Sequence, residues 1–564
     1  MKHLLIFTIG PVQSFIAQAR KVQDLFAGSR LLSDLIAEAM IYAKRKAKAQ
    51  IVYPYFDENK LDADYPNRFV AFVEPENAQE FGKDLENHIQ EKFVNDAVSQ
   101  LSNYLSDEVL NYAEKQLEHI LKIYWVILPE VDENNYHEKI EEAERLLGGI
   151  KNLRKFEHFA ETGRKCSLNG EYNVIIYHHD TEKPEPYWLS YTKPVEVKKH
   201  FDLGLLAKGE ALSAISFYKR LYKREQNKFD ATCEIAYLDT IEIDKKQYTE
   251  LAKDVQLIYE DNRTDRVLKK SNINKDKLNN ELKELFDAIP KGNKPQKYYA
   301  VLMFDADRMG RWIAGDYLKE KTKLLEFQKE LSKLLSEFAQ FAKRYIDGKE
   351  DGEKKGQTIY AGGDDYLGLI NLKHLFPVLE TLRENFKEIV SEKIKDYVKD
   401  NKELTFSAGV VIAHYKTPLS FVLKEARATE KSAKDDGDRD AVAFTVLKRS
   451  GEIHRSVMKW YEDDTFLPKE LYTIIKTLRS KQTSNKFITN LTQEFDPVAN
   501  KNINADLVKA ELKRLLRLNE VQKLENAVFT LFDHLVKNEG ELYKFIQLLN
   551  IADFISRNIN KIEN

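Results

Sequence analysis

Apolar positions in the first 130 residues follow two different rhythms. The continuous run "HLLIFTIG" (3–10) predicts a buried strand, because it is dense in apolar and β-branched residues. After Gly10-Pro11 the apolar residues recur every three or four positions, which is typical of an amphipathic helix. The remaining elements expected here are strands at 51–56 and 68–74, a helix at about 76–118, and a strand at 123–129. The order βαββαβ predicts an antiparallel sheet with helices on one face, a ferredoxin-like or palm unit.

The same order of elements recurs in the second half of the chain. "YYAVLMFDADRMG" (298–310) indicates a buried strand that ends in acidic residues, and "GQTIYAGGDDYLGLI" indicates a hairpin. The other expected elements are helices at about 319–347 and 373–400, strands at 405–414 and 441–447, and a helix between these two strands. This pattern is again interpreted as βαββαβ and predicts a second palm.

Helical periodicity dominates the other parts of the chain. Residues 135–290 are interpreted as a helical middle domain, which the Pro-, Gly- and Lys-rich stretch 290–297 links to the second palm. From about residue 450 the pattern is purely helical and predicts a C-terminal bundle. The predicted class is therefore α+β and multidomain. The expected domains are the first palm (1–134), the helical middle domain (135–290), the second palm (291–449) and the helical bundle (450–564).

Charge and cysteine content restrict the partners and the compartment. The 88 basic and 91 acidic residues leave a net charge of −3, whereas a protein that grips nucleic acid alone is usually basic. If RNA is bound, we therefore expect partner subunits to make most of the phosphate contacts. Two cysteines provide no disulfide framework and indicate a reducing compartment, the cytoplasm. No apolar run reaches about 18 residues, so no membrane span is expected.

Four aspartates are the strongest candidates for chemistry. Asp305 and Asp307 end one predicted strand, and Asp364 and Asp365 lie at the tip of the next hairpin, so a palm sheet would bring them to one edge. Grouped carboxylates repel one another unless cations lie between them, and hard oxygen ligands suit Mg²⁺. Two such ions can activate a hydroxyl and stabilise a leaving oxygen in nucleotidyl transfer.

The glycines before Asp364 have a matching use. Gly362 and Gly363 would let a nucleotide approach the backbone closely and would permit positive φ in the turn. The alternative is that Gly-Gly-Asp-Asp serves turn geometry alone, because glycine and aspartate are favoured turn residues. The apolar strand that ends in Asp-x-Asp upstream of the hairpin favours the metal site over this alternative.

Five motifs in order resemble the Cas10 family of type III CRISPR effector complexes, in its Cmr2 branch. The resemblance runs from residue 3 to about 452, and the helical tail is consistent with it. The motifs are "GPVQSFIAQARKVQDLFAGSRLLS", "YPNRFVAFV", "FDADRMG", "YAGGDDYLGLI" and "VLKRSGE".

The resemblance implies an activity, the residues that bind its metal ions, and its partner subunits. Members of this family polymerise ATP into cyclic oligoadenylate when their complex binds target RNA, and pyrophosphate leaves. Asp305 and Asp364 would be the main ligands of Mg²⁺ or Mn²⁺, and Asp365 a second ligand or an orienting group, while Asp307 either helps or caps the next helix. The implied partners are other Cmr-type subunits (a Cmr3-like neighbour and a small helical subunit), with crRNA and target RNA bound through the complex.

The first palm resembles a non-catalytic cradle for a second nucleotide. It has Gly10-Pro11 where the second palm has Asp305, and its hairpin contains Asp62 and Asp64 but no Gly-Gly-Asp-Asp. The polar candidates for nucleotide binding are Ser14, Arg20 and Ser29 in the first palm, and Lys431 and Lys434 after the second. Four of these five have a structural alternative: a surface charge for Arg20, a helix cap for Ser29, and a solvated helix face for the two lysines.

The chain departs from the family pattern at two places. It starts at the first palm, which leaves no room for the HD nuclease domain of many relatives, and His179-Asp180 lacks the spaced partners of such a site. We therefore expect no DNase activity. Relatives have Cys-x-x-Cys pairs here, whereas this chain has Cys166 but Asn169 in place of the second cysteine, and Cys233 is isolated. Because two separate thiols cannot form a tetrahedral site, we expect no zinc and a buried Cys166.

Three other functions remain open from the sequence. The same palm chemistry could join AMP from ATP to S-adenosylmethionine, which also releases pyrophosphate, so the acids do not discriminate between the products. The palm could instead be vestigial in a non-catalytic scaffold subunit, which the intact acids disfavour. The third function is that of a free-standing diguanylate-cyclase-like enzyme, in which the first palm and the helical tail would have no role.

Overall fold

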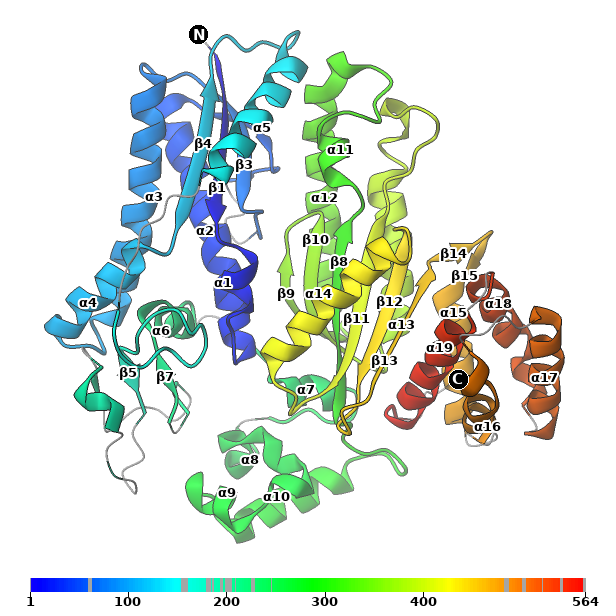
Figure 1. The fold of residues 1–564 in the computed structure, drawn as a ribbon. Coiled ribbons are helices and arrows are strands. Elements are labelled where there is room, and N and C mark those ends of the chain that lie inside the picture. The colour runs from blue at the N-terminus through cyan, green and yellow to red at the C-terminus, as the bar shows by residue number, and fades with distance from the viewer. Residues whose placement is uncertain are drawn as a thin grey trace.

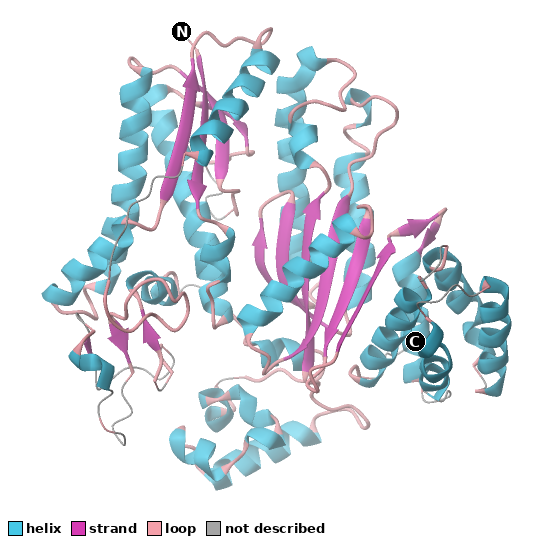
Figure 2. Cartoon of the chain, viewed as in Figure 1, coloured by secondary structure: helices cyan, strands magenta, loops and turns pink. Residues whose placement is uncertain are grey.

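The computed structural model shows two palms side by side, with helical groups below and beside the second (Figure 1). It describes residues 2–58, 63–153, 161–178, 184, 187–192, 196–197, 205–207, 209–224, 229–244, 246–480, 486–499, 504–519, 521–537 and 541–560. The strands form two large sheets, one in each palm, and smaller sheets outside them (Figure 2).

The first palm has the predicted βαββαβ order. Its sheet runs β2-β3-β1-β4 with every neighbouring pair antiparallel. Side chains on β1 alternate between two cores: Leu5, Phe7 and Ile9 face α2, α3 and α4, whereas Leu4 and Ile6 face α5. The elements are β1 (His3–Gly10), α1 (Gln13–Ala17), α2 (Val22–Ala47), β2 (Gln50–Tyr53), β3 (Arg68–Val73), α3 (Ala78–Leu101), α4 (Asp107–Glu118), β4 (Lys122–Leu128) and α5 (Tyr136–Asn152).

The segment expected to be a helical middle domain is not uniform. Its first helix, α5, covers a face of the first palm's sheet, so the expected boundary at 134 separates a sheet from its own covering helix. A small sheet of order β6-β5-β7 lies within it, so the segment is not purely helical. The elements are β5 (Ile176–Tyr177), β6 (Glu196–Val197), β7 (Ala211–Leu212), α6 (Ala214–Leu221), α7 (Thr232–Tyr237), α8 (Thr249–Lys253), α9 (Asp265–Lys270) and α10 (Lys275–Asp287).

The second palm is larger than predicted. Its sheet runs β13-β12-β11-β8-β10-β9, in which the four strands β11, β8, β10 and β9 form the palm order. The helix α14 then leads to β12, which lies parallel to β11, and β13 extends the edge. The elements are β8 (Tyr298–Ala306), α11 (Met309–Ile313), α12 (Leu324–Ile346), β9 (Gly356–Ala361), β10 (Asp365–Asn371), α13 (Leu375–Phe386), β11 (Phe406–His414), α14 (Leu419–Asp435), β12 (Ala441–Leu447) and β13 (Ile453–Lys459).

The prediction of a purely helical chain from about residue 450 is therefore wrong for its first residues. β13 pairs with β12, and a short hairpin follows before the helices begin. The helices α12 and α13 of the second palm share one hydrophobic core with the C-terminal helices. The C-terminal elements are β14 (Tyr461–Glu462), β15 (Thr465–Phe466), α15 (Leu467–Arg479), α16 (Lys486–Phe495), α17 (Ala505–Leu518), α18 (Glu525–Leu535) and α19 (Leu542–Arg557).

The two palms pack together because each has a helix that contacts a strand of the other. The first palm's α2 contacts β9 of the second, and the second palm's α12 contacts β2 of the first. The start of α2 adds Val22, Leu25 and Phe26 to the core on the β8 and β10 sheet face that also packs against α14. This packing places residues of the first palm beside the acidic edge of the second.

Candidate functional site

The acidic edge is formed by two neighbouring antiparallel strands of the second palm. Asp365, the first residue of β10, lies directly opposite Asp305 near the end of β8. The carbonyl of Asp364 accepts a hydrogen bond from the Ala306 amide (2.8 Å), which ties the hairpin tip to the strand end. The predicted meeting of strand end and hairpin is confirmed, whereas the catalytic roles of these residues stay a prediction.

The carboxylates destabilise one another's charged forms. Burial and the neighbouring Asp305 raise the pKa of Asp364 from 3.8 to about 6. Burial, with Asp364 and Asp305, raises the pKa of Asp365 well above its usual range. The Asp365 Oδ1 atom is buried and has no hydrogen-bond partner among the described residues. The edge therefore holds more negative charge than its protein neighbours neutralise.

This repulsion predicts how stability depends on pH. The folded chain keeps the Asp364 proton up to about pH 6, whereas the unfolded chain loses it near 3.8, so ionisation in this window lowers the free energy of unfolding. We expect Asp364→Asn to stabilise the protein relative to wild type, by an amount that grows across this window to about 1–2 kcal/mol. Urea unfolding of both proteins at several pH values measures it. A difference that does not change with pH would contradict the prediction.

Lys434 is a cation that the structure brings into contact with these acids. Its Nζ lies 2.5 Å from Asp305 Oδ2 and 2.6 Å from Glu430 Oε1, one turn earlier on α14. Lys431, predicted as its companion, is exposed to solvent on the same helix. For Lys431 the solvated-face alternative therefore fits the structure, whereas Lys434 is part of the acidic edge.

The acidic edge fits a divalent cation by its chemistry. Asp305, Asp364 and Asp365 offer the carboxylate oxygens that Mg²⁺ prefers, and the unpartnered Asp365 Oδ1 is an open acceptor. In the described part of the chain, no group of three or more His, Cys, Asp or Glu side chains is placed to hold a metal ion. The Lys434 ammonium instead contacts the Asp305 carboxylate, where a metal would bind.

The two glycines of the hairpin are required for different structural reasons. Gly363 has φ +112°, a backbone conformation that other residues rarely adopt, as the turn prediction required. At Gly362 a Cβ atom would lie 1.7 Å from the Tyr360 hydroxyl, so the tyrosine packs directly against this glycine, and close approach of a nucleotide here stays a prediction. Close packing inside the protein is therefore sufficient to require Gly362.

We expect Gly363→Ala to destabilise the protein by about 1–3 kcal/mol, because alanine is strained at this φ. The added Cβ would lie 3.5 Å from Leu335 Cβ, an ordinary contact, so the cost comes from the backbone alone. Gly148→Ala in α5 is the matched control, since nothing lies within 4 Å of its Cβ, and it should leave stability equal or slightly higher. Equal unfolding midpoints for the two variants would contradict this prediction.

Asp307 does not belong to the acidic edge. Its side chain is 4% exposed and accepts hydrogen bonds from Thr405 Oγ1 (2.7 Å), Ser407 Oγ (2.7 Å) and the Asp440 amide (3.0 Å). The N-cap residue of α11 is Arg308, at φ +58°. The cap role of Asp307 is therefore wrong, because its hydrogen bonds join the ends of β8 and β11 to the loop before β12. A supporting role at the metal site stays a prediction that these contacts do not favour.

Two residues of the first palm act on the acidic edge, and sequence reasoning missed both. Arg68 at the start of β3 lowers the pKa of Asp364, and its guanidinium also pairs with Glu144 of α5. Burial, with Asp364, Asp365 and Asp305, raises the pKa of the Tyr53 hydroxyl well above its usual range. Arg68 lies within the motif "YPNRFVAFV", but only its position in the folded chain shows which acid it faces.

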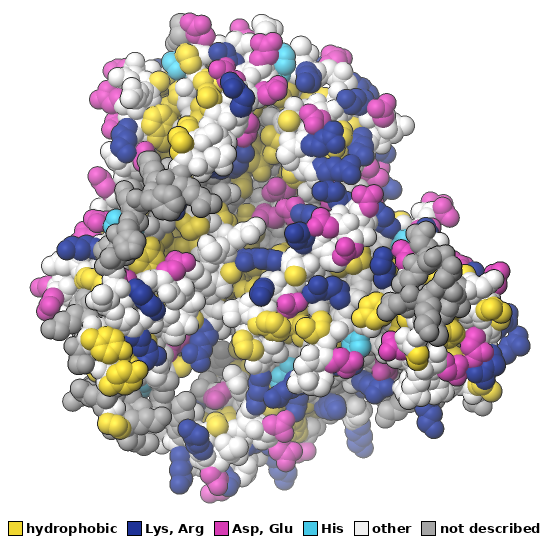
Figure 3. Space-filling view, viewed as in Figure 1, with side chains coloured by type: hydrophobic (Ala, Val, Ile, Leu, Met, Phe, Trp, Pro, Cys, Tyr) yellow, Lys and Arg dark blue, Asp and Glu magenta, His cyan; other side chains and the backbone are white. Residues whose placement is uncertain are grey.

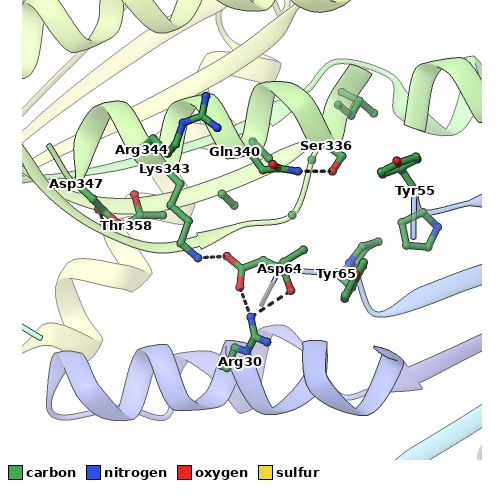
Figure 4. Close-up of a pocket in the computed structure, with 18 of the residues that line it drawn as sticks. Arg30, Tyr55, Asp64, Tyr65, Ser336, Gln340, Lys343, Arg344, Asp347 and Thr358 are labelled. Atoms are coloured by element: carbon green, nitrogen blue, oxygen red, sulfur yellow. Dashed lines mark hydrogen bonds and ion pairs between the residues drawn. The ribbon is translucent and has the colours of Figure 1, made fainter. Parts of the chain in front are cut away.

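A cavity of about 1070 Å³ lies between the palms and reaches Gly362 and Gly363. The surface is hollowed between the two palms, and acidic side chains gather there (Figure 3). In the cavity, Asp64 of the first palm is 3% exposed in its side chain and pairs with Arg30 (3.5 Å) and with Lys343 of α12 (3.1 Å), as Figure 4 shows. Asp64 therefore links the two palms. Asp62, the other acid of this hairpin, lies outside the described residues.

The polar candidates of the first palm are not brought together. Ser14 is exposed on α1, and the exposed side chain of Arg20 lies 3.8 Å from Glu210 of the middle segment. Ser29 is buried within α2, so it is not the N-cap of this helix. Nucleotide binding by these three residues stays a prediction, and none of the three lines the cavity between the palms.

The structure also bears on the predictions about the cysteines, the His179-Asp180 pair and the membrane. Cys166 and Cys233 are both buried and free, in separate hydrophobic clusters, so the expected burial of Cys166 is confirmed. His179 and Asp180 lie outside the described residues. Among the helices of the described chain, none has the length and apolar character needed to cross a membrane.

Two packed palms, one with paired carboxylates at its hairpin, define a nucleotide-cyclase-like palm protein. The family described as "Cas10/Cmr2, second palm domain" matches residues 298–443, and "CRISPR-associated protein Cmr2, N-terminal" matches residues 4–98. Both of these segments therefore match the Cas10/Cmr2 family, which is the family that the five sequence motifs resemble.

Individual relatives agree with this assignment. The chain is 26% identical to "CRISPR system Cmr subunit Cmr2" of Pyrococcus furiosus, over 98% of this chain and 74% of that protein. It is 23% identical to "CRISPR system single-strand-specific deoxyribonuclease Cas10/Csm1 (subtype III-A)" of Streptococcus thermophilus, over 34% of this chain and 25% of that protein. The fold is similar to a chain of the type III-B Cmr-beta complex in its apo state, with a TM-score of 0.63 at 13% identity, covering 98% of this chain and 82% of that chain.

Proposed function

We propose that this chain is the large subunit of a type III CRISPR effector complex and a metal-dependent nucleotidyltransferase. In this proposal, target RNA activates the conversion of ATP to cyclic oligoadenylate, with release of pyrophosphate. The observation that carries the proposal is the placement of Asp305, Asp364 and Asp365 at adjacent strand ends, where Asp305 raises the pKa of Asp364, and both raise the pKa of Asp365. Such an excess of carboxylate charge is typical of sites that bind metal and nucleotide.

The proposed reaction is an in-line displacement. The 3′-hydroxyl oxygen of one nucleotide forms a bond to the α-phosphorus of an ATP, and the bond from that phosphorus to the bridging oxygen of the β-phosphate breaks. Asp365 Oδ1 has no partner in the described chain, so it is free to accept the hydroxyl proton. The Lys434 ammonium would attract the polyphosphate.

A divalent cation would supply the remaining chemistry. Asp305, Asp364 and Asp365 would hold Mg²⁺ or Mn²⁺, which would favour ionisation of the attacking hydroxyl and offset the charge of the leaving pyrophosphate. The first palm contributes Arg68, whose charge lowers the pKa of Asp364, and Tyr53, whose buried hydroxyl has a pKa that these carboxylates raise.

The proposed partners follow from the relatives. A structure similar in fold is described as the type III-B Cmr-beta bound to cognate target RNA. We propose that this chain likewise assembles with Cmr-type subunits, including a Cmr3-like neighbour and a small helical subunit, and meets crRNA and target RNA there. The net charge of −3 supports this division of labour, because it leaves most phosphate contacts to other subunits.

Product identification tests the proposal. The complex, reconstituted with crRNA and target RNA, is incubated with Mg²⁺ and ATP, with and without S-adenosylmethionine, and the products are identified by mass spectrometry. We expect cyclic oligoadenylate and pyrophosphate from ATP alone, and neither without target RNA. A product that requires S-adenosylmethionine would change the acceptor but keep the site. Absence of pyrophosphate under all conditions would indicate a scaffold and would overturn the proposal.

A further inference from the structure

Lys434 lies between two carboxylates rather than at the open surface. Its Nζ lies 2.5 Å from Asp305 Oδ2 and 2.6 Å from Glu430 Oε1. The side chains of Lys434, Asp305 and Glu430 are 23%, 40% and 14% exposed, so the ammonium is only partly solvated. An ion pair with this degree of burial is stronger than one at an open surface.

The packing of α14 fixes this position. Gly409 of β11 lets the helix approach the strand closely, because a Cβ there would lie 2.4 Å from the Glu430 amide nitrogen. The Thr429 and Thr445 hydroxyls share a hydrogen bond of 2.8 Å on the same side of the helix. The helix is thereby locked against β11 and β12, and Lys434 projects over the end of β8, whereas Lys431 stays exposed.

Lys434 therefore competes for the same atom as a metal ion. An Asp305 oxygen that faces an ammonium at 2.5 Å is not free to coordinate a divalent cation. Asp365 lies opposite Asp305 and Asp364 precedes it at the hairpin tip, so one lysine faces three carboxylates and does not neutralise the group. A polyphosphate, in contrast, carries several negative charges and can attract Lys434 away from Asp305.

We propose that Lys434 is a place-holding cation that couples metal binding to nucleotide binding. Its ammonium occupies Asp305 until the polyphosphate of an incoming nucleotide draws it away, and Asp305 is then released to the divalent cation. The inference rests on the proposed function for the identity of the metal ligands. Its consequence is that metal and nucleotide increase each other's affinity by the same factor.

The first test measures metal binding without turnover. Mn²⁺ is titrated into the full chain without nucleotide, and free Mn²⁺ is followed by electron paramagnetic resonance. We expect Lys434→Gln to bind Mn²⁺ about tenfold more tightly than wild type, within the usual range of such couplings. Lys431→Gln removes a lysine charge one turn away on the same helix and should leave the Mn²⁺ affinity unchanged.

The second test measures the coupling from the nucleotide side. Binding of α,β-methylene-ATP, which lacks the bond to be broken, is measured by calorimetry with saturating Mg²⁺ and with no divalent metal. Wild type should show a Mg²⁺-dependent gain in affinity that is at least about fivefold larger than that of Lys434→Gln. The double variant Asp305→Asn/Lys434→Gln should lose the increased Mn²⁺ affinity, which locates the effect at Asp305.

The outcomes separate this inference from the proposed function. Equal Mn²⁺ affinities for Lys434→Gln and wild type, both measurable, would overturn the inference and leave the metal site in place. A chain that binds no Mn²⁺ with or without nucleotide would overturn both. Lys434→Met keeps the apolar stem of the side chain and repeats the test if the Gln variant has a lowered melting temperature.

Discussion

Asp305→Asn is expected to lower the rate of product formation by about a hundredfold or more while leaving the protein folded. The substitution keeps the shape of the side chain but removes the charge that a divalent cation and the reaction need. The structural cost is small, because the Asp305 side chain is 40% exposed and its ion pair with Lys434 is partly solvated. The measurement is pyrophosphate release by the complex with target RNA, together with the thermal midpoint of the isolated chain.

The control for this variant is two residues away on the same segment. Asp307→Asn makes the same chemical change at a residue that contacts Thr405, Ser407 and Asp440 instead of the acidic edge. Full activity of Asp305→Asn would contradict the assignment of Asp305 to the site. Loss of activity that follows loss of folding would contradict the expectation that its role is chemical.

Asp307→Asn is expected to lower the free energy of unfolding by about 2–4 kcal/mol. The buried carboxylate accepts two hydroxyl donors and one backbone amide, and charge-assisted bonds of this kind are stronger than neutral ones. The asparagine places an NH₂ group on one side, where it faces either a hydroxyl or an amide donor. The loop that Asp307 holds is itself strained, because Asp438, Arg439 and Asp440 have φ between +43° and +59°.

Urea unfolding of the isolated chain measures this effect, and Thr405→Val offers an independent test. Removing the Thr405 hydroxyl deletes one of the three donors and should produce a smaller loss in the same direction. If Asp307→Asn were as stable as wild type but inactive, Asp307 would belong to the catalytic group after all.

The sequence predicted every strand of the first palm's sheet and every strand of the second palm's sheet except β13. Continuous apolar runs and the repeat of three and four marked β1, α2 and the hairpin of β9 and β10, because these signals are local. The residues after 450 were misinterpreted for a physical reason. β13 buries His454 and Ser456 beside Met458, so its inward face is partly polar and lacks the usual apolar alternation.

The partners that make this burial acceptable lie far along the chain. His454 Nδ1 lies 2.6 Å from Gln547 Oε1, and Ser456 Oγ donates to the carbonyl of Lys544 (2.9 Å), both on α19. A buried polar side chain is tolerated when it is hydrogen-bonded. Nothing near β13 in the sequence indicates that such partners exist about 90 residues later.

For the candidate site too, some features follow from the sequence and others only from the tertiary structure. By itself, the sequence determined that an acidic strand end and a Gly-Gly-Asp-Asp hairpin meet, because strand order and turn chemistry are set by neighbouring residues. Only the tertiary structure decided that Asp305 faces the site while Asp307 ties strands together, and that Lys434 rather than Lys431 reaches the acids. It also brought Arg68 and Tyr53 across from the other palm. Side-chain direction and contacts between domains depend on how α14 and the first palm pack, and these are properties of the whole folded chain.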